Sequence, residues 1–456
     1  MKTFTPDLDP AVVDRLREYA ARFAPDFPQS KPARWAGVYL HGLLLDGERK
    51  SIEPLSRRIT LPPELSATDP EQALQQFISQ SPWDDQKVLT RYRALMAEPF
   101  GSPDGVFVVD DTSFPKRGRH SVGVQHQYCG ALGKQANCQV AVTLHYSGPR
   151  GHFPLAVRLH LPASWTADAT RLDAAGVPEE FRAARTKGEI ALGLIDQVRA
   201  EGILGGTVVA DLGYGSSVVR AGLAERGLRY VVGVPANSVV FPNEPRWIQP
   251  PRAGRGGPVP ERWVLDPTSP PPVSVEVVAR GLKLGRVSWR AGTKGRLSAR
   301  FGWVRVWPGH EWKLGACAHA EPVWLLVEAR DDGQVQYAVS NLPPRTSRLK
   351  AVRVEAALAD RAGAPTDEGG VGTRPLRGAE LAGVPPPRGD GPVGLRVPPA
   401  RAEPSSTRPQ EAGKKGGAEP PLTVPGIRRA LQQLLLPVAR PDCQYCRPHR
   451  SPVLTE

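Results

Sequence analysis

Two short runs of valine each lead into aspartate, and they limit the folds that this chain can adopt. The first run, GVFVVDDTSF, places Asp110 and Asp111 directly after Val106–Val109. The second run, GGTVVADLGYG, ends in Asp211. Short apolar runs of this kind predict buried strands, and we expect each strand to deliver its acid to its end. Acids on neighbouring strands can hold divalent metal between them, as nucleases and phosphoryl-transfer enzymes require.

The composition is that of a globular chain with a basic surface. With 456 residues, of which 40% are hydrophobic, the chain can fill the cores of two or three domains. The excess of 59 Lys and Arg over 46 Asp and Glu gives a net charge of +13, which favours a polyanionic partner such as nucleic acid. The alternative is a bacterial proteome in which many enzymes are basic and the charge has no particular partner.

Cysteine usage and hydropathy indicate a cytoplasmic protein. The five cysteines are odd in number and widely spaced, so they do not form a disulfide framework. No apolar run approaches the roughly 18 residues of a membrane span, and no signal peptide precedes Pro6. Near the C-terminus, Cys443 and Cys446 form half of a zinc site beside His449, but a fourth ligand is not evident. A motif without metal is therefore the favoured interpretation of this tail.

The first 95 residues have helical periodicity and are expected to form a helical DNA-binding domain. Apolar positions recur at helical spacing through residues 12–23, 35–44 and 74–78. Basic residues flank a further helix expected over residues 51–56, and they suit contacts with phosphate. They are Arg49, Lys50, Arg57 and Arg58. A solvated, charged helix face is the alternative.

From residue 105 the pattern changes to that of strands. We expect strands over 106–109, 139–144 and 155–161, and further on a strand ending at Asp211 and another over 230–234. A helix is expected over 187–201. Strands followed by alternating helices and strands predict an α/β sheet of mixed order, the layout of an RNase H-like fold. In residues 100–235 such a catalytic core would bring distant acids to one site.

Several longer strings resemble the bacterial insertion-sequence DDE transposases, specifically the seven-oh-one family. They are VVDDTSFPKRGRHSVGVQHQYCGALGKQANCQVAV and VVADLGYGSS, with RKSIEP and SPWDD before them and WRAGTKGRLSARF after them. The resemblance covers residues 38–349 and resumes near the C-terminus. It implies that Asp111, which precedes a threonine, is the first catalytic acid, with Asp110 as its neighbour. Asp211 matches the second acid.

The resemblance also implies the chemistry and the partners. Asp111 and Asp211 would hold Mg²⁺ or Mn²⁺, and the protein would act as a homo-oligomer on terminal inverted repeats and target DNA. Water, and then a freed 3′-hydroxyl, attacks a phosphodiester in line, while two ions about 4 Å apart stabilise the entering and leaving oxygens. Three basic residues follow the first acid in a loop and are expected near phosphate, with surface solubility as the alternative. They are Lys116, Arg117 and Arg119.

Residues 236–345 are expected to form a β-rich insertion and the return to the core. This segment is rich in Pro and Trp, and it contains expected strands over 273–279 and 300–306. By the resemblance, Trp289, Arg290 and Lys294 in the string WRAGTK would face DNA, where an aromatic ring can stack on an unpaired base. A tryptophan in the core of the sheet is the alternative.

The family's third acid, expected on a helix beyond the string YAVSNLPP, is absent. Between Tyr337 and Tyr445 the chain contains no Phe, Trp, Tyr or His, while Pro, Gly, Ala and Arg accumulate. This composition predicts disorder. When the codons for 359–388 are read one nucleotide later, they permit the string PIERAxQQMKEELGLDHFEGRSWRGFHHH. That string contains the family's missing E-x6-K helix.

We therefore interpret residues 350–413 as the product of a frameshift and residues 414–456 as the family tail, with a short amphipathic helix over 427–436. Without its third acid the chain is expected to be an inactive transposase. Two alternatives remain at this stage. One is a catalytically dead DNA-binding remnant that inhibits intact copies, and the other is an RNase H-like nuclease of different purpose.

Overall fold

The structure is a computed structural model that describes most of the chain up to residue 347. The described residues are 7–45, 47, 49–62, 65–250, 262–292, 295–347, 427, 430–432 and 434. The segment predicted to be disordered, 350–413, lies outside them, as do Cys443, Cys446 and His449. Among the helices of the described part, none is long and apolar enough to cross a membrane.

The N-terminal region is helical, as its periodicity predicts. Its helices are α1 (Val12–Ala21), α2 (Ser30–Leu44), α3 (Ile52–Ser56) and α4 (Pro70–Ser79), with a 3₁₀ turn, η1 (Ala24–Asp26), after α1. Asp69 caps α4 by accepting hydrogen bonds from two backbone N–H groups of its first turn. Trp35, Leu55 and Leu74 are buried at the centre of this region.

Residues near the C-terminus pack against these helices. Residues 427, 430–432 and 434 are helical, which agrees with the helix expected over 427–436. Leu431 is buried in the same core cluster as Trp35, and the Gln432 side-chain amide donates to the Leu44 carbonyl at 3.1 Å. Because Leu44 ends α2, this contact satisfies a carbonyl that the helix itself leaves unpaired.

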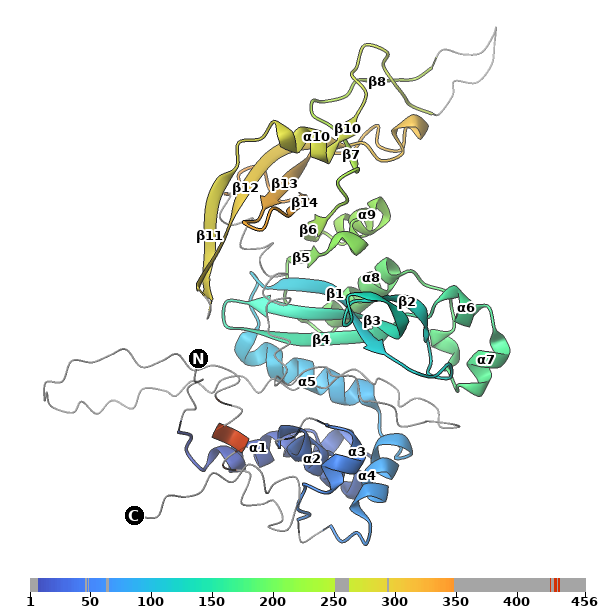
Figure 1. Cartoon of the computed structure of the whole chain (residues 1–456), viewed down its shortest axis with the longest axis vertical. Helices are drawn as coiled ribbons and strands as arrows, with labels where there is room; N and C mark the ends of the chain where they lie inside the picture. The colour runs from blue at the N-terminus through green and yellow to red at the C-terminus, as the bar shows by residue number, and fades with distance from the viewer. Residues whose placement is uncertain are drawn as a thin grey trace, which may run out of the picture.

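Helix α5 (Asp85–Phe100) lies between the N-terminal helices and the sheet (Figure 1). Arg91 on this helix forms an ion pair with Asp26 of the helical region, and Arg93 forms one with Glu201 on the sheet side. The helix thus crosses the boundary that was expected near residue 95 and contacts the parts on both sides of it.

The central sheet has the strand order of an RNase H-like fold. Its strands are β1 (Val106–Pro115), β2 (Gln125–Cys129), β3 (Lys134–Gly148), β4 (Gly151–Leu159), β5 (Thr207–Ala210) and β6 (Arg229–Gly233). Strand β3 pairs antiparallel with β1 and β4, while β5 pairs parallel with both β1 and β6. The resulting order is β4-β3-β1-β5-β6, so the predicted mixed sheet is confirmed.

Two helices cover one face of this sheet. They are α8 (Lys187–Ala200) and α9 (Ser217–Glu225), and the first agrees with the helix expected over 187–201. Their apolar residues share one core cluster with Val109 and Ala210. Val108 and Val209 belong to a separate cluster because successive strand residues point to opposite faces. The two shorter helices that precede α8, α6 (Ala163–Thr166) and α7 (Ala169–Ala174), pack with the turn around Val122.

Strand β1 is longer than its sequence predicts. Asp110 and Asp111 lie inside the strand, not at its end, whereas Asp211 follows the last residue of β5 as expected. The reason is the length of β3, which pairs with β1 from Val106 to Pro115, while β5 pairs only with its first four residues. The acids therefore lie where β1 has lost one of its two neighbours.

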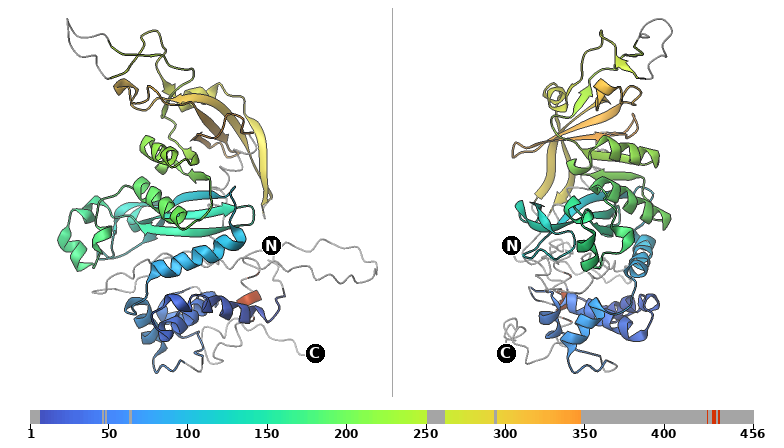
Figure 2. Two further views of the ribbon diagram at one scale, coloured as in Figure 1. Left: turned by 180° about the vertical axis from the view of Figure 1, so that it is seen from behind. Right: turned by 90° about the vertical axis from the view of Figure 1, so that its right-hand side faces the viewer.

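The strands of the insertion extend the same sheet. The pairing of β14 (Val335–Ser340) with β6 continues it through β13 (Val323–Ala329), β12 (Gly295–Pro308), β7 (Val239–Phe241) and β10 (Val273–Ser274). Strand β11 (Gly285–Gly292) forms a long curved hairpin with β12 (Figure 2). Strands β8 (Trp247–Ile248) and β9 (Val264–Leu265) form a separate pair.

The strand expected over residues 273–279 is wrong for most of its length. Only its first two residues are extended, and α10 (Val275–Arg280) follows. The Ser274 hydroxyl accepts the Val277 N–H and caps this helix, so the local cap prevails over the alternating apolar pattern.

Candidate metal and DNA site

Asp110 and Asp211 each directly follow one member of a residue pair that joins two parallel strands. Val109 on β1 is the partner of Ala210 on β5, so each acid is the next residue along its strand. The residues before them, Val108 and Val209, share one apolar cluster. The register thus favours Asp110, rather than Asp111, as the acid that shares a face with Asp211.

Asp111 is held by two residues from distant parts of the chain. The Tyr214 hydroxyl donates to its Oδ1 at 2.5 Å, and the Lys187 ammonium donates to its Oδ2 at 2.5 Å. Lys187 is the first residue of α8, and Tyr214 ends the 3₁₀ turn η3 (Leu212–Tyr214) that follows β5. Both carboxylate oxygens of Asp111 therefore have a donor.

The turn after β5 fixes Asp211 and Tyr214 together. The Asp211 carboxylate caps η3 by accepting the Gly213 N–H at 2.9 Å. Gly233, at the end of β6, packs directly against this turn. A Cβ atom at Gly233 would lie 2.6 Å from the Leu212 nitrogen and 2.9 Å from the Asp211 carbonyl carbon. A side chain at this position would therefore displace the backbone that carries the acid.

We expect Gly233→Ala to lower both stability and metal affinity. The clash is with backbone atoms, so relief requires a shift of the strand end or of the turn, at a cost of about 1–3 kcal/mol. Thermal melting and Mn²⁺ titration check this, with Gly193→Ala in α8 as the control because nothing lies near its Cβ position. The control should be neutral or stabilising. Unchanged Mn²⁺ affinity in Gly233→Ala would contradict the placement of Asp211.

The electrostatics of the site favour a cation. Burial is the main cause that raises the pKa of Asp211, and the neighbouring charges of Asp110 and Asp111 raise it further. The Gly213 N–H and Lys187 act in the opposite direction. Burial and Asp111 also raise the pKa of Tyr214, so its hydroxyl remains a donor at neutral pH. The site therefore concentrates negative charge.

The donor chemistry fits a hard divalent cation. Carboxylate oxygens are the ligands that Mg²⁺ and Mn²⁺ prefer, and here they come from adjacent strands. Among the residues that the structure describes, no group of three or more His, Cys, Asp or Glu side chains is arranged to hold a metal ion. Of the three candidate acids, Asp111 is engaged in an ion pair with Lys187.

The predicted basic residues of the helical region divide into exposed and engaged ones. Arg49 and Arg57 are exposed, and Arg57 forms an ion pair with Glu53 one turn earlier in α3. The Lys50 ammonium donates to the Leu45 carbonyl. Arg58 is buried and donates to the carbonyls of Pro54 and Arg49, so its predicted contact with DNA stays a prediction. Its guanidinium holds the connection between α2 and α3.

The loop after β1 carries the three predicted basic side chains. Arg117 and Arg119 are exposed, and Lys116 is half-buried. The Asn137 side chain on β3 holds this loop by donating to the carbonyls of Lys116 and Gly118, at 3.0 and 2.8 Å. The loop is thus attached to the strand that also pairs with Asp110.

The predicted DNA-facing residues of the insertion lie only partly within the described residues. Trp289 and Arg290 belong to β11, but their side chains lie outside the described part, as does Lys294 altogether. Two tryptophans for which the sequence predicted no role pack against each other on β12 and β13. Trp303 and Trp324 are 4.2 Å apart between ring centroids, and the Trp324 indole N–H donates to the Leu342 carbonyl.

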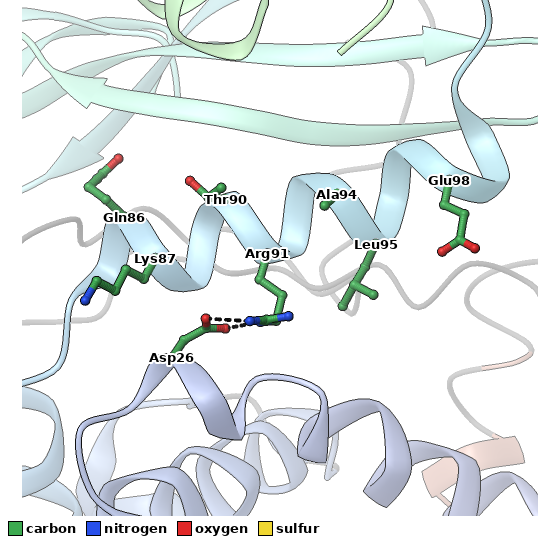
Figure 3. A pocket seen from close by; sticks show the side chains of 8 residues that line it. All are labelled: Asp26, Gln86, Lys87, Thr90, Arg91, Ala94, Leu95 and Glu98. Carbon is green, nitrogen blue, oxygen red and sulfur yellow. Dashed lines mark hydrogen bonds and ion pairs between the residues drawn. The ribbon is translucent and has the colours of Figure 1, made fainter. Parts of the chain in front are cut away.

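A groove between α5 and the helical region has a different character. It is lined mainly by α5, and the ion pair of Arg91 with Asp26 crosses it (Figure 3). Glu98 and Lys87 add one charge of each sign. None of the predicted site residues lines this groove, and its mixed charges do not resemble a phosphate site.

Sequence reasoning missed Lys187 and Tyr214. Both are far from Asp111 along the chain, at separations of 76 and 103 residues. The string TKGE does signal a helix start, because Thr186 and Glu189 form a capping box, and DLGYG places a tyrosine near the second acid. Neither signal indicates that the two side chains meet at the first acid.

Comparison with known proteins gives two matches. A family model described as DDE superfamily endonuclease matches residues 22–296. A protein of Microchaete diplosiphon, named probable transposase for insertion sequence element IS701, is 30% identical over 226 residues. This alignment covers 49% of the present chain and 54% of that protein, so the chain spans about half the length of the curated relative that it matches.

Proposed function

Since the chain belongs to the DDE superfamily endonucleases, we propose that it is the transposase chain of a bacterial insertion sequence. In this function it binds the terminal inverted repeats of its element, as a homo-oligomer in the bacterial nucleoid, and acts on DNA with Mg²⁺ or Mn²⁺. The observation that carries the proposal is the parallel pairing of β1 with β5, which places Asp211 beside the two acids of β1.

The three aspartates have different parts in this proposal. Asp110 and Asp211 would hold a divalent ion, and Asp111, whose charge also acts on Asp211, would join them when its carboxylate is released from Lys187. The bound ion would polarise a phosphodiester oxygen and activate the attacking hydroxyl. Because the third acid of the family is not present in frame, we propose that the chain binds metal and DNA but does not transfer strands.

Exposed arginines support DNA as the partner. Arg117 and Arg119 lie in the loop that follows the strand of the first acids. Arg49 and Arg57 add exposed positive charge in the helical region. The net charge of +13 strengthens association with DNA over the whole molecule.

We expect the double variant Arg117→Ser/Arg119→Ser to weaken DNA binding and its dependence on salt. Each lost phosphate contact should reduce the slope of log affinity against log salt by about one unit. Fluorescence anisotropy at several salt concentrations measures both effects. The control variant Arg199→Ser/Lys283→Ser removes the same charge from exposed positions on α8 and before β11. Equal losses of DNA affinity in the two double variants would show that net charge alone causes the effect.

A strand-transfer assay with oligonucleotides that carry the element ends tests the proposed function. Binding to the ends without cleavage supports the transposase chain that has lost its third acid, which could then occupy the ends and inhibit intact copies. Transfer of strands shows that the chain is complete as written. Cleavage without preference for the ends supports a nuclease of other purpose on the same fold.

A further inference from the structure

We propose that Lys187 is a positioning residue that holds Asp111 in the metal-free protein and competes with a divalent cation for that carboxylate. The inference rests on the proposed function, since it concerns the ion that the three acids would bind. It assigns a role to a lysine that is located on a different element from every acid of the site.

The contact geometry shows how Lys187 acts on Asp111. Its ammonium contacts Oδ2 at 2.5 Å, and the Tyr214 hydroxyl contacts Oδ1 at 2.5 Å. Tyr214 is buried, so it is a fixed donor, whereas the side chain of Lys187 is 36% exposed and that of Asp111 is 31% exposed. An ion from solvent can therefore reach Asp111, and the lysine has room to leave.

The start of α8 is an unfavourable position for the positive charge of Lys187. It is the first residue of α8, where the helix dipole disfavours a positive charge. The capping box of Thr186 and Glu189 already satisfies the helix start without it. Its ion pair with Asp111 offsets this cost, which links the residue to the site rather than to the stability of the helix.

The charge balance around the acids makes the lysine a competitor for metal. Burial and Lys187 lower the pKa of the nearby His160, so this imidazole is neutral at physiological pH. Lys187 thus supplies positive charge to the three aspartates of the site. A divalent ion would carry more charge into the same place, and its binding to Asp111 would require the ammonium to withdraw.

Neutral substitution of Lys187 should therefore strengthen metal binding. A partly exposed ion pair is worth little, so we expect Lys187→Met to bind Mn²⁺ about two- to tenfold more tightly than the unmodified chain. Lys187→Gln, which keeps a polar side chain, should show the same direction. Lys187→Arg keeps the charge and should resemble the unmodified chain. A residue that only supported the structure would give the opposite sign, because its loss would misplace Asp111 and weaken binding.

Calorimetric titration of the full chain with Mn²⁺ tests the inference, with the exposed Lys283→Met as the control for loss of one positive charge. Tighter binding in Lys187→Met and Lys187→Gln, but not in Lys283→Met, supports it. Unchanged or weaker binding in both neutral variants overturns it, while binding that still depends on Asp211 leaves the proposed function intact. Absence of Mn²⁺ binding from the unmodified chain and from both neutral variants contradicts the inference and the proposed function together.

Discussion

Replacing Asp211 by alanine should remove Mn²⁺ binding, with a loss of affinity of at least about 100-fold. Loss of an outer partner alone typically costs 10–100-fold in metal affinity, and Asp211 is proposed as a direct ligand. Its environment supports this, since burial raises its pKa and the negative charges of the two acids of β1 raise it further. Calorimetric titration measures the loss. Asp196→Ala is the control. It removes the same charge from α8, where Asp196 forms an exposed ion pair with Arg226.

The same titration separates the two acids of β1. Asp110 and Asp211 directly follow the partner residues Val109 and Ala210, while Asp111 is held by Lys187 and Tyr214. We therefore expect Asp110→Ala to lose more Mn²⁺ affinity than Asp111→Ala. The reverse order would assign the principal role to Asp111, as the resemblance to transposases implies. Equal and negligible losses in both variants would contradict the site altogether.

Replacing Arg93 by methionine should destabilise the protein by about 3–5 kcal/mol. Arg93 is fully buried and forms an ion pair with Glu201, and it also donates to the Leu155 carbonyl at 3.2 Å and to the Thr90 hydroxyl at 3.0 Å. Removing one partner of a buried pair leaves the other charge without compensation. Because these contacts join α5 to β4 and to the end of α8, the core should lose its attachment to α5.

Denaturant unfolding measures this loss, and a second variant isolates its cause. In Arg93→Met/Glu201→Met both charges are absent, so part of the lost stability should return. A cost below about 1 kcal/mol in the single variant would contradict the role of this ion pair, since such a value is typical of pairs at the surface. A double variant no better than the single one would attribute the effect to packing.

Local patterns predicted the elements whose limits are set locally. The strand that ends at Asp211 and the helix over 187–201 agree with β5 and α8, because a short apolar run and a capping box define them. The mixed character of the core sheet followed from the RNase H-like interpretation. In contrast, the end of β1 depends on β3, which pairs with β1 as far as Pro115. The valine run alone therefore predicted a strand end that is too early.

The site was predictable only in part, because side-chain neighbours depend on tertiary contacts. The acids were found since each follows an apolar run. The sequence did not predict which acid of β1 lies beside Asp211, because this depends on the register of β1 with β5. Arg58 was assigned to DNA from its charge, but it folds back onto carbonyls of its own connection. Lys187 approaches Asp111 across 76 residues, a contact for which the sequence holds no local signal.

The proposal that loss of the third acid prevents strand transfer is tested most directly by comparing the chain as written with a frame-restored version. The restored gene is designed to encode the proposed E-x6-K helix in place of residues 350–413 and leaves the acids of β1 and β5 unchanged. Both proteins are assayed for strand transfer with a marked element. We expect both proteins to bind Mn²⁺ and the element ends, and only the restored protein to transfer strands. Comparable transfer by the chain as written, with no restored product detected by mass spectrometry, would contradict the proposal and would require another residue to supply the third acid.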